Sequence, residues 1–364
     1  MVILVKKHIL LILIAAWFLC SCSTSTAKRT INIAVVGSPS VYSEYYEQGI
    51  KKAYEDVCEE YKDSGFEINM NIYDDKDDYE TAERITAKLV NDDSITAIIA
   101  SSSAEICANQ AYQADKAGKV LICPRWIYDD TLSEGRYSRV FSLNYSSEQI
   151  GSVMENIAQN SIAKKWVVCY SDDKISRTEI KGFTDNEGVN VVDFVKINVL
   201  TSDFSKIIDR WKLLGIEGVV LVPYENEGFE IFYKLKEAMP NLYIISDSNL
   251  DNDNELQENR ENFNNVYLLD SFYTRSEESE KFTDEESLDT WEVHGYNALR
   301  IIIDTAVKNN TNDSDEIAEI LHKDGYDGEL ESYRFTEIGT LEPEIFSYIE
   351  ITADDVILHT ITAE

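Results

Sequence analysis

Three consecutive hydroxyl side chains stand where a predicted strand ends and a predicted helix begins. An apolar run over residues 95–100 is followed by Ser101, Ser102 and Ser103, and an amphipathic helix is predicted over residues 105–117. Hydroxyl groups and the unpaired N–H groups of a helix N-terminus together favour an anion, so this segment is a candidate site for a ligand carboxylate or phosphate. The alternative is an ordinary N-cap, in which Ser103 only caps the helix.

An arginine and a tryptophan follow the next predicted strand, which covers residues 119–123. The Arg125 guanidinium could bind an anionic group through two parallel hydrogen bonds, and the Trp126 indole could cover an apolar part of the same ligand. The alternative is a surface arginine beside a tryptophan that only packs the loop. Two anion-favouring features therefore lie in adjacent loops.

Polar residues also stand at or after the ends of strands predicted in the second half of the chain. They are Tyr170 with Asp172, Tyr224 with Glu225, and Asp247, while Tyr42 is a further candidate in the loop after the first strand. Ligands of open parallel sheets sit beyond the carboxyl ends of the strands, so these side chains are candidate binding residues. Acidic residues are abundant in this chain, so each of these acids could equally be an ordinary solvated side chain.

Catalytic groups are scarce in this sequence. After the N-terminal segment the only histidines are His294, His322 and His359, and none belongs to an HExxH motif. The chain has no Gly-x-Ser-x-Gly nucleophile elbow and no Walker-type phosphate loop, so metallohydrolases, serine hydrolases and nucleotidases lack their minimum parts. Residues 249–255 look like a calcium loop but lack the glycine of its sharp turn, and we interpret them as a polar surface loop. We expect no enzyme activity, no cofactor and no metal.

Strand-like and helical segments alternate with a period of about 25 to 30 residues, the length that a right-handed βαβ unit requires. Strands are predicted over residues 31–36, 67–73, 95–100 and 119–123, and again over 166–170, 191–197, 218–222, 243–245 and 266–269. A late helix carries Tyr296, Leu299 and Ile303 at helical spacing, which is typical of a core-facing stripe. The pattern predicts an α/β fold with two similar, doubly wound, mainly parallel halves.

The N-terminus has the features of an export signal over residues 1–21. Two lysines precede an apolar run over residues 9–19, which is about half of the roughly 20 residues that a membrane-spanning helix needs. Leu19, Ser21 and Cys22 resemble the lipobox of bacterial lipoproteins, which implies cleavage before Cys22 and attachment of lipid to its thiol. An ordinary cleaved signal without lipid is the alternative. Either way we expect an extracytoplasmic protein.

Composition excludes some partners. The chain has 67 acidic and 33 basic residues and a formal net charge of −34. Such a surface repels nucleic acid, and acidic runs such as residues 74–78 predict a solvated exterior.

Four cysteines follow Cys22, and no two of them form a CxxC pair, so zinc binding has little support. Cys58 is predicted on the apolar face of a helix, and Cys123 and Cys169 are predicted in apolar strands. Buried free thiols are therefore favoured over a disulfide, although a bridge stays open as the second interpretation. We expect no disulfide to be required, Cys107 included.

Eight short segments stand in an order that is familiar as a set. They are residues 31–37, 73–76, 82–93 and 98–103, followed by 203–205, 218–222, 296–298 and 315–318. This order resembles the type I periplasmic solute-binding proteins of ABC transporters, in particular the branched-chain amino acid (Leu/Ile/Val)-binding group. The resemblance covers nearly the whole chain after the signal region.

The resemblance implies two Rossmann-like lobes joined by a three-stranded hinge, with crossings near Asn144, Ser271 and Leu341. Lobe 1 would then comprise residues 31–144 with 272–340, and lobe 2 residues 145–271 with 341–364, after a linker over residues 22–30. A monomer would capture one small ligand between the lobes and deliver it to ABC permease subunits.

The resemblance also implies roles for the candidate residues. In this family the loop at Ser101 to Ser103 holds the carboxylate of an amino acid, tyrosines such as Tyr170 and Tyr224 line the cleft, and an acid, here Asp247 or Glu225, meets the ammonium group. Arg125 and Trp126 depart from the family pattern of small residues, so we expect the ligand to be an amino acid or related small carboxylate without assuming branched-chain specificity. A ligand-sensing lipoprotein of the same fold that feeds a signalling partner is one alternative, and an extracellular hydrolase is a disfavoured one.

Overall fold

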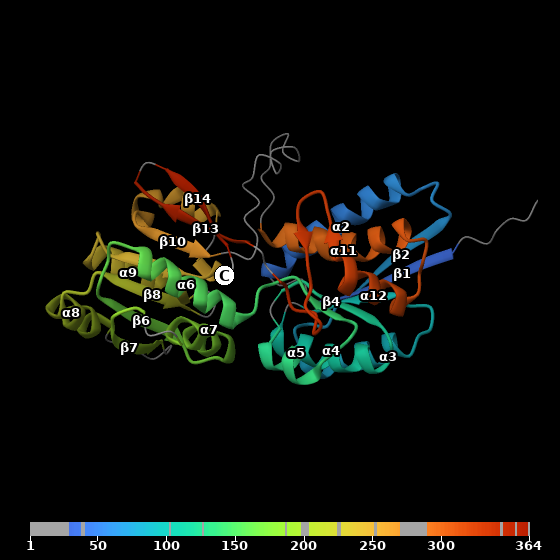
Figure 1. Cartoon of the computed structure of the whole chain (residues 1–364), viewed down its shortest axis with the longest axis horizontal. Coiled ribbons are helices and arrows are strands. Elements are labelled where there is room, and N and C mark those ends of the chain that lie inside the picture. Colours follow the sequence, from blue (N-terminus) through green and yellow to red (C-terminus); the bar gives the residue numbers. More distant parts are fainter. Residues whose placement is uncertain are drawn as a thin grey trace, which may run out of the picture.

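The computed structural model describes residues 29–37, 41–101, 103–125, 127–185, 188–197, 204–223, 227–250, 253–269, 290–342, 345–353 and 355–362. Two α/β lobes lie side by side along the long axis of the molecule (Figure 1). Each lobe is built on its own sheet, with helices packed on both faces.

Lobe 1 is built on a five-stranded, fully parallel sheet with the order β2-β1-β3-β4-β5. Its strands are β1 (Arg29–Val36), β2 (Phe66–Tyr73), β3 (Ala97–Ile99), β4 (Val120–Cys123) and β5 (Val140–Ser142). One face is covered by α2 (Val41–Glu60), α11 (Thr290–Lys308) and α12 (Ser314–Asp324), and the other by α3 (Tyr79–Val90), α4 (Ala104–Lys116) and α5 (Asp129–Gly135). Alternate residues of β1 enter the two cores, with Ile33 on one side and Ala34 on the other, as the period of two in a strand requires.

Lobe 2 is built on a seven-stranded sheet with the order β14-β13-β10-β9-β8-β6-β7. The parallel strands are β6 (Trp166–Ser171), β7 (Val191–Ile197), β8 (Gly218–Val222), β9 (Tyr243–Ser246) and β10 (Val266–Leu269), and β13 (Ile345–Ile351) and β14 (Val356–Thr362) add an antiparallel hairpin. The helices α6 (Ser147–Asn160) and α7 (Lys174–Thr184) contribute to the core on one face, and α8 (Phe204–Leu214) and α9 (Glu227–Ala238) to the core on the other. Short elements complete the fold: η1 (Ser248–Leu250), α10 (Asp253–Glu258), η2 (Arg260–Phe263), β11 (Tyr326–Asp327) and β12 (Ser332–Tyr333).

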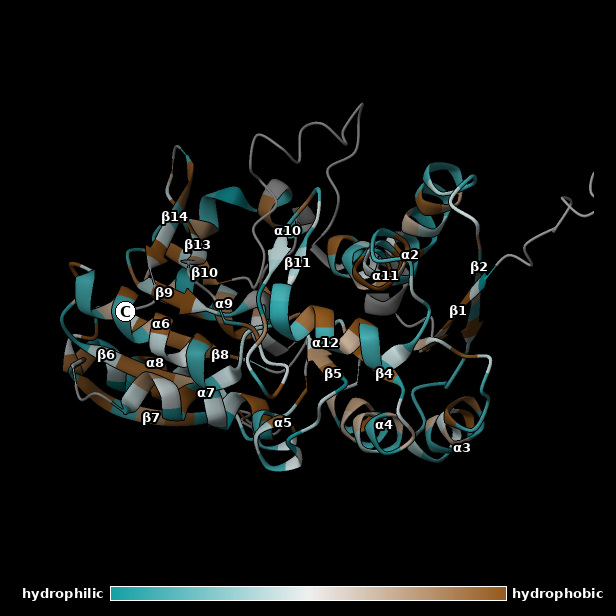
Figure 2. Ribbon diagram, turned by 45° about the vertical axis from the view of Figure 1, so that its right-hand side comes forward, coloured by the Kyte–Doolittle hydropathy of each residue, from teal (hydrophilic) through white to brown (hydrophobic). Residues whose placement is uncertain are grey.

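The central strands are apolar throughout because helices cover both of their faces. All residues of β4 and of β8 are buried. Hydrophobic residues, brown in Figure 2, are concentrated in the strands, whereas the helices mix brown with teal. This is the pattern of helices that bury one stripe against a sheet.

Local sequence signals fix where several helices begin. The Asp78 carboxylate accepts a hydrogen bond from the Thr81 N–H at 2.9 Å, which caps α3. Ser146 and Gln149 form a capping box at the start of α6. Such caps satisfy backbone N–H groups that the first helical turn leaves unpaired, so they set the end of each preceding loop.

The predicted α/β class and the mainly parallel sheets are confirmed, and β7, β8 and β10 have the predicted bounds. The pattern did not reveal the antiparallel hairpin of β13 and β14. The chain leaves the lobe 1 sheet after Ser142 and enters lobe 2 at α6, returns to lobe 1 by α11, and ends in lobe 2 at β13 and β14. The expected crossing near Ser271 lies outside the described residues, and the predicted lobe boundaries stay a prediction.

Two expectations were wrong. Residues 249–255 are not a plain surface loop, because most of the segment belongs to η1 and α10, where Leu250 and Leu256 are buried and hold the turns against the core. Cys58 is exposed on α2, since the buried stripe runs through Ile50, Ala53 and Val57, and the next residue turns away from it by about 100°.

Candidate functional site

The serine loop lies at the carboxyl end of β3, as predicted. Ser101 is buried, and its backbone N–H donates to the Gln110 side-chain oxygen at 2.9 Å, so that N–H is engaged within the protein. Ser103 is the N-cap residue of α4, yet its side chain makes no capping hydrogen bond. The purely structural role considered for the Ser103 hydroxyl is therefore not seen, which keeps this hydroxyl a candidate for ligand binding.

The arginine loop lies beside the serine loop, because β3 and β4 are paired neighbours and Ile99 stands opposite Ile122. Arg125 is half-buried at the carboxyl end of β4. Behind it lies His294 of α11, whose imidazole contacts the Pro124 backbone and whose pKa is lowered to about 3, first by burial and then by the Arg125 guanidinium. A histidine with this pKa is neutral at physiological pH, so α11 supports the arginine loop without adding charge.

The support from α11 depends on unusually close packing against α2. A Cβ on Gly295 would lie 2.1 Å from the Tyr46 backbone oxygen, and one on Gly49 would lie 1.9 Å from the Glu292 backbone oxygen. Any side chain at these two positions would push the helices apart. Because His294 is next to Gly295, this contact positions the imidazole against the arginine loop.

Asp75 is a residue of this edge that the sequence analysis did not select. It belongs to an acidic run that was expected to be solvated, and this expectation is wrong for Asp75, which is fully buried after β2. Burial raises the pKa of its carboxyl group, and hydrogen bonds from the Asp77 backbone and the Ser101 side chain partly oppose that change. The signal was available, since Asp75 follows a strand end like the selected residues, but the charged neighbours suggested a surface.

In lobe 2, the structure separates the residues predicted after β6. Tyr170 is the penultimate residue of that strand and is half-buried. Asp172 is exposed and pairs with Lys196 at 3.0 Å and Arg177 at 3.1 Å; the hydrogen bond from Lys196 is the main cause that lowers its pKa. Asp173 instead caps α7 by accepting from the Ser176 N–H at 2.9 Å.

Asp247 follows β9 and is 1% exposed. Its carboxylate accepts hydrogen bonds from the Asn249 backbone N–H at 3.2 Å and from the Asn249 side-chain amide at 2.7 Å. Burial raises its pKa to about 7 against the effect of these bonds. Asp247 is thus in the predicted place, but in this conformation it presents almost no surface to a ligand.

A second buried acid accompanies Asp247. Glu179 of α7 is fully buried, and neither of its carboxylate oxygens has a hydrogen-bond partner among the described residues. Its pKa is raised well above the ordinary value by burial, and then by the charges of Asp247, Asp173 and Asp129. Sequence reasoning missed Glu179, although an acid at helical spacing between Ser176 and Phe183, both on the buried stripe of α7, was a usable signal.

The lobes also touch beside these loops. Asp129 of α5 accepts hydrogen bonds from the backbone N–H groups of Ser147 at 3.0 Å and Glu148 at 3.1 Å, at the N-terminus of α6. Lys174 of α7 pairs with Asp130 of α5 at 2.5 Å. These contacts join α5 of lobe 1 to the N-terminal ends of α6 and α7 in lobe 2.

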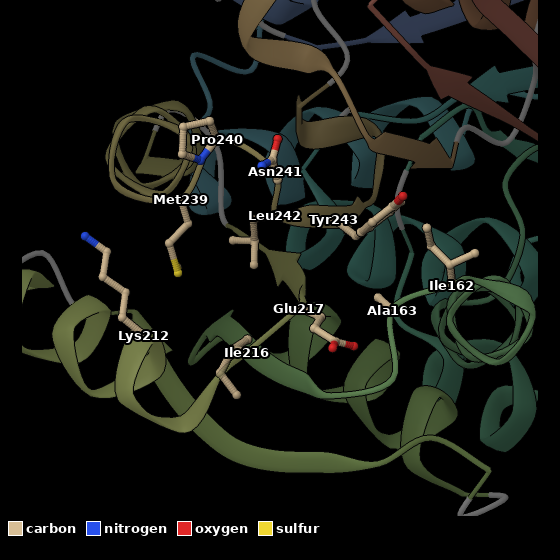
Figure 3. A pocket seen from close by; sticks show the side chains of 10 residues that line it. All are labelled: Ile162, Ala163, Lys212, Ile216, Glu217, Met239, Pro240, Asn241, Leu242 and Tyr243. Carbon is tan, nitrogen blue, oxygen red and sulfur yellow. The ribbon is translucent and has the colours of Figure 1, made fainter.

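Two pockets lie at the opposite, amino ends of the strands. The one in Figure 3, of about 510 Å³, is lined by Ile216 and Glu217, which precede β8, and by Asn241 and Leu242, which precede β9. Another, of about 440 Å³, includes Thr96 and Lys119 of lobe 1. Neither includes a residue of the candidate loops, and ligands of parallel sheets bind at the carboxyl ends.

Several predicted site residues lie outside the part of the chain that the structure describes. Ser102, Trp126, Tyr224, Glu225 and Cys22 are outside the described residues, and Tyr42 belongs to α2 but its side chain is not described. Of the candidates that are described, Ser101, Ser103 and Arg125 lie at the carboxyl edge of the lobe 1 sheet. Tyr170 and Asp247 lie at the carboxyl ends of β6 and β9, the two strands that flank β8 in lobe 2.

The model of the periplasmic binding protein family matches residues 30–340. The chain belongs to this family. The match runs from β1 to the residue before Leu341, so it includes both candidate edges and excludes the hairpin of β13 and β14. It confirms the resemblance inferred from the order of segments, and membership implies a location outside the cytoplasm.

Solved structures share the fold of this periplasmic binding protein. The branched-chain amino acid transporter substrate-binding protein LivJ from Streptococcus pneumoniae, in complex with isoleucine, has a TM-score of 0.78 at 19% identity, covering 92% of this chain and 100% of that one. A solute-binding protein from R. palustris, in complex with benzoate, has a TM-score of 0.75 at 14% identity, covering 92% and 98%. At these identities the likeness concerns the fold alone.

A curated relative is more similar in sequence over a shorter span. The leucine-, isoleucine-, valine-, threonine- and alanine-binding protein of Pseudomonas aeruginosa is 26% identical over an alignment of 226 residues that covers 59% of this chain. The chain spans only 60% of the length of that relative.

Two further observations concern the whole described part of this periplasmic binding protein. No described helix combines the length and the apolar character that crossing a membrane requires. Within the described ranges, His, Cys, Asp and Glu side chains do not gather into a group of three or more that could hold a metal ion.

Proposed function

We propose that this periplasmic binding protein captures a small carboxylate, such as an amino acid, between its two lobes and delivers it to an ABC importer. The observation that carries the proposal is the half-buried Arg125 beside Ser103, whose hydroxyl does not cap α4. Both residues lie on adjacent loops at the carboxyl edge of lobe 1. A guanidinium and a hydroxyl are both suited to a carboxylate. Isoleucine and benzoate, which occupy the two structural relatives, have a carboxylate in common.

The neutral His294 behind Arg125 strengthens this interpretation. An acid in its place would pair with the guanidinium and weaken its attraction for a ligand anion. A buried, uncharged imidazole supports the loop and adds no negative charge beside the guanidinium.

The test is a thermal-shift screen over amino acids and small carboxylates, in which a ligand that binds only the folded state raises the melting temperature. Each carboxylate is paired with its neutral amide, for example isoleucine with isoleucinamide and benzoate with benzamide. We expect at least one acid to stabilise the protein and its amide to have no effect at the same concentration. Equal stabilisation by an acid and its amide would contradict the carboxylate proposal.

Capture between lobes is tested separately by solution scattering with the ligand from that screen. Closure of two hinged lobes around a ligand makes the particle more compact. An unchanged scattering profile at saturating ligand would argue against capture by closure.

Anchoring by lipid is the finer part of the proposal and concerns Cys22. Metabolic labelling with a fatty acid should mark the wild type, and Cys22→Ser should abolish the label. Cys20→Ser is the matched control, because it removes the neighbouring thiol and leaves the proposed lipobox cysteine in place. Label retained in Cys22→Ser would exclude this assignment.

A further inference from the structure

Two buried cysteines meet directly beneath the candidate edge of lobe 1. Cys107 lies in the first turn of α4, Cys123 is the last residue of β4, and both side chains are 0% exposed. Their sulfur atoms are 2.9 Å apart. This separation is about 0.9 Å longer than an S–S bond of roughly 2.0 Å. We propose that Cys107 and Cys123 form a disulfide once the chain has left the cytoplasm.

The surroundings of the pair favour a stable bridge. Both thiols belong to the apolar core between α4 and the sheet, with Ala111 and Leu121 among their neighbours in that cluster. The buried Tyr46 hydroxyl of α2 lies within electrostatic reach of both cysteines. A disulfide has no donor to satisfy, so it suits this apolar site at least as well as two thiols do.

Burial also determines when the bond can form. It raises the pKa of the Cys123 thiol well above its ordinary value, and Cys107 adds to this change. Thiolates are the reactive form, and both side chains are 0% exposed, so an oxidant cannot reach the folded pair and oxidation has to precede or accompany burial. The bridge is therefore expected to form during folding after export.

The chemistry needs an oxidant, which we take to be an exported thiol–disulfide oxidoreductase or a small-molecule disulfide. One cysteine thiolate attacks the oxidant's disulfide, which forms a mixed disulfide and releases one sulfur of the oxidant as a thiolate, and the second cysteine then displaces the sulfur that is still bound. The S–S bond of the protein forms as that of the oxidant breaks, and the oxidant takes up two electrons and the two thiol protons as two thiol groups. Family membership implies the compartment, where disulfides persist.

The bridge would tie together the two loops proposed to bind the ligand. Cys107 lies one turn after Ser103, and its N–H donates to the Ser103 carbonyl at 2.8 Å. Cys123 lies two residues before Arg125. A bond between them fixes the start of α4 relative to the end of β4, so it would hold Ser103 and Arg125 at a constant spacing. The inference depends on the compartment and not on which ligand binds.

Peptide mapping of the exported full chain tests the proposal without any variant. The protein is purified without reductant, denatured, alkylated with iodoacetamide and digested with trypsin. Cleavage after Lys88, Lys116, Lys119 and Arg125 places the two cysteines in peptides 89–116 and 120–125. We expect these peptides as one linked species that separates on reduction, whereas Cys58 and Cys169 are alkylated. Full alkylation of both Cys107 and Cys123 without reduction would overturn the proposal.

Thermal unfolding gives an independent readout. Closing a loop of about 15 residues in the unfolded chain should raise the melting temperature by roughly 5 to 10 °C. Wild type treated with a phosphine reductant in denaturant and refolded in the same reductant should lose this amount. A Cys107→Ala/Cys123→Ala variant should not respond to reductant, and Cys169→Ala should respond like wild type. If the double variant does not fold, the comparison of oxidised with reduced wild type still tests the bridge. An unchanged melting temperature of the wild type after reduction would contradict it.

Discussion

The two lobes use the same architecture of parallel strands and carboxyl-end loops, but lobe 1 places an arginine at this edge and lobe 2 places acids close to it, at a different depth. In lobe 1 the charged candidate is Arg125, which is half-buried and backed by a neutral histidine. In lobe 2 the acids Asp247 and Glu179 lie below the surface, where burial raises the pKa of both. Under the proposed function, lobe 1 contacts the ligand directly, and the lobe 2 acids act first on the protonation and stability of their own lobe.

The largest effect should follow from removing the Arg125 guanidinium. Arg125→Ala should weaken binding of the ligand found in the screen by about 2 to 5 kcal/mol, the usual loss when one partner of a buried charge pair is truncated, which is roughly 30-fold to several thousand-fold in Kd. Calorimetry measures the change. Arg125→Lys should lose less, because it keeps the charge but not the bidentate geometry.

Arg84→Ala is the matched control for Arg125. It removes an exposed arginine on α3 of the same lobe, away from the carboxyl edge, so Kd should stay within about twofold. If Arg125→Ala leaves Kd within about threefold, the guanidinium does not hold the ligand and the contrast between lobes loses its functional meaning.

Part of the carboxyl edge of lobe 1 could be predicted from the sequence, because the ends of strands are marked by local signals. Apolar runs followed by Ser101 or Pro124 mark the carboxyl ends of β3 and β4, and neighbouring strands of a parallel sheet bring such loops together. The family could be recognised for a related reason, since the order of many weak segments survives where no single motif is diagnostic.

What could not be predicted depends on contacts between distant segments. His294 contacts Pro124 from α11, which Gly49 and Gly295 allow to pack closely on α2, and both contacts join segments that are far apart in the sequence. Asp75 and Asp172 have similar local contexts, yet one is fully buried and the other is exposed and ion-paired. Burial is set by tertiary packing, so residue type and strand position alone could not distinguish them.

The lobe 2 acids predict a pH effect whose sign follows from the raised pKa. Between its ordinary value near 4 and about 7, Asp247 binds a proton in the folded state that it releases in the unfolded state. Its contribution to stability is therefore complete below about pH 4 and is lost as the pH rises through about 7. Asp247→Asn removes this titration, so the variant should gain about 2 to 4 kcal/mol relative to wild type between pH 5 and pH 8.

Denaturant unfolding of both proteins at several pH values measures this difference. Asp172→Asn is the control, because hydrogen bonds lower the pKa of Asp172 and the difference from wild type should be flat from pH 5 to pH 8. A wild type whose stability relative to Asp247→Asn does not fall over this range would show that Asp247 is ionised in the folded state, and the contrast in depth would then be wrong.

The smallest effect should come from the ion pair between the lobes. Measuring it tests whether charges at the rim, rather than Arg125, set the affinity. Lys174 and Asp130 are 2.5 Å apart, but their side chains are 43% and 46% exposed, so water and salt screen the pair. The Lys174 ammonium also lies 4.4 Å from the centre of the Tyr128 ring, a contact that solvent weakens in the same way. A double-mutant cycle with Lys174→Ala and Asp130→Ala should give a coupling energy for ligand binding below about 1 kcal/mol. A larger coupling that disappears at high salt would show that charges at the rim, rather than Arg125 at the strand edge, set the affinity.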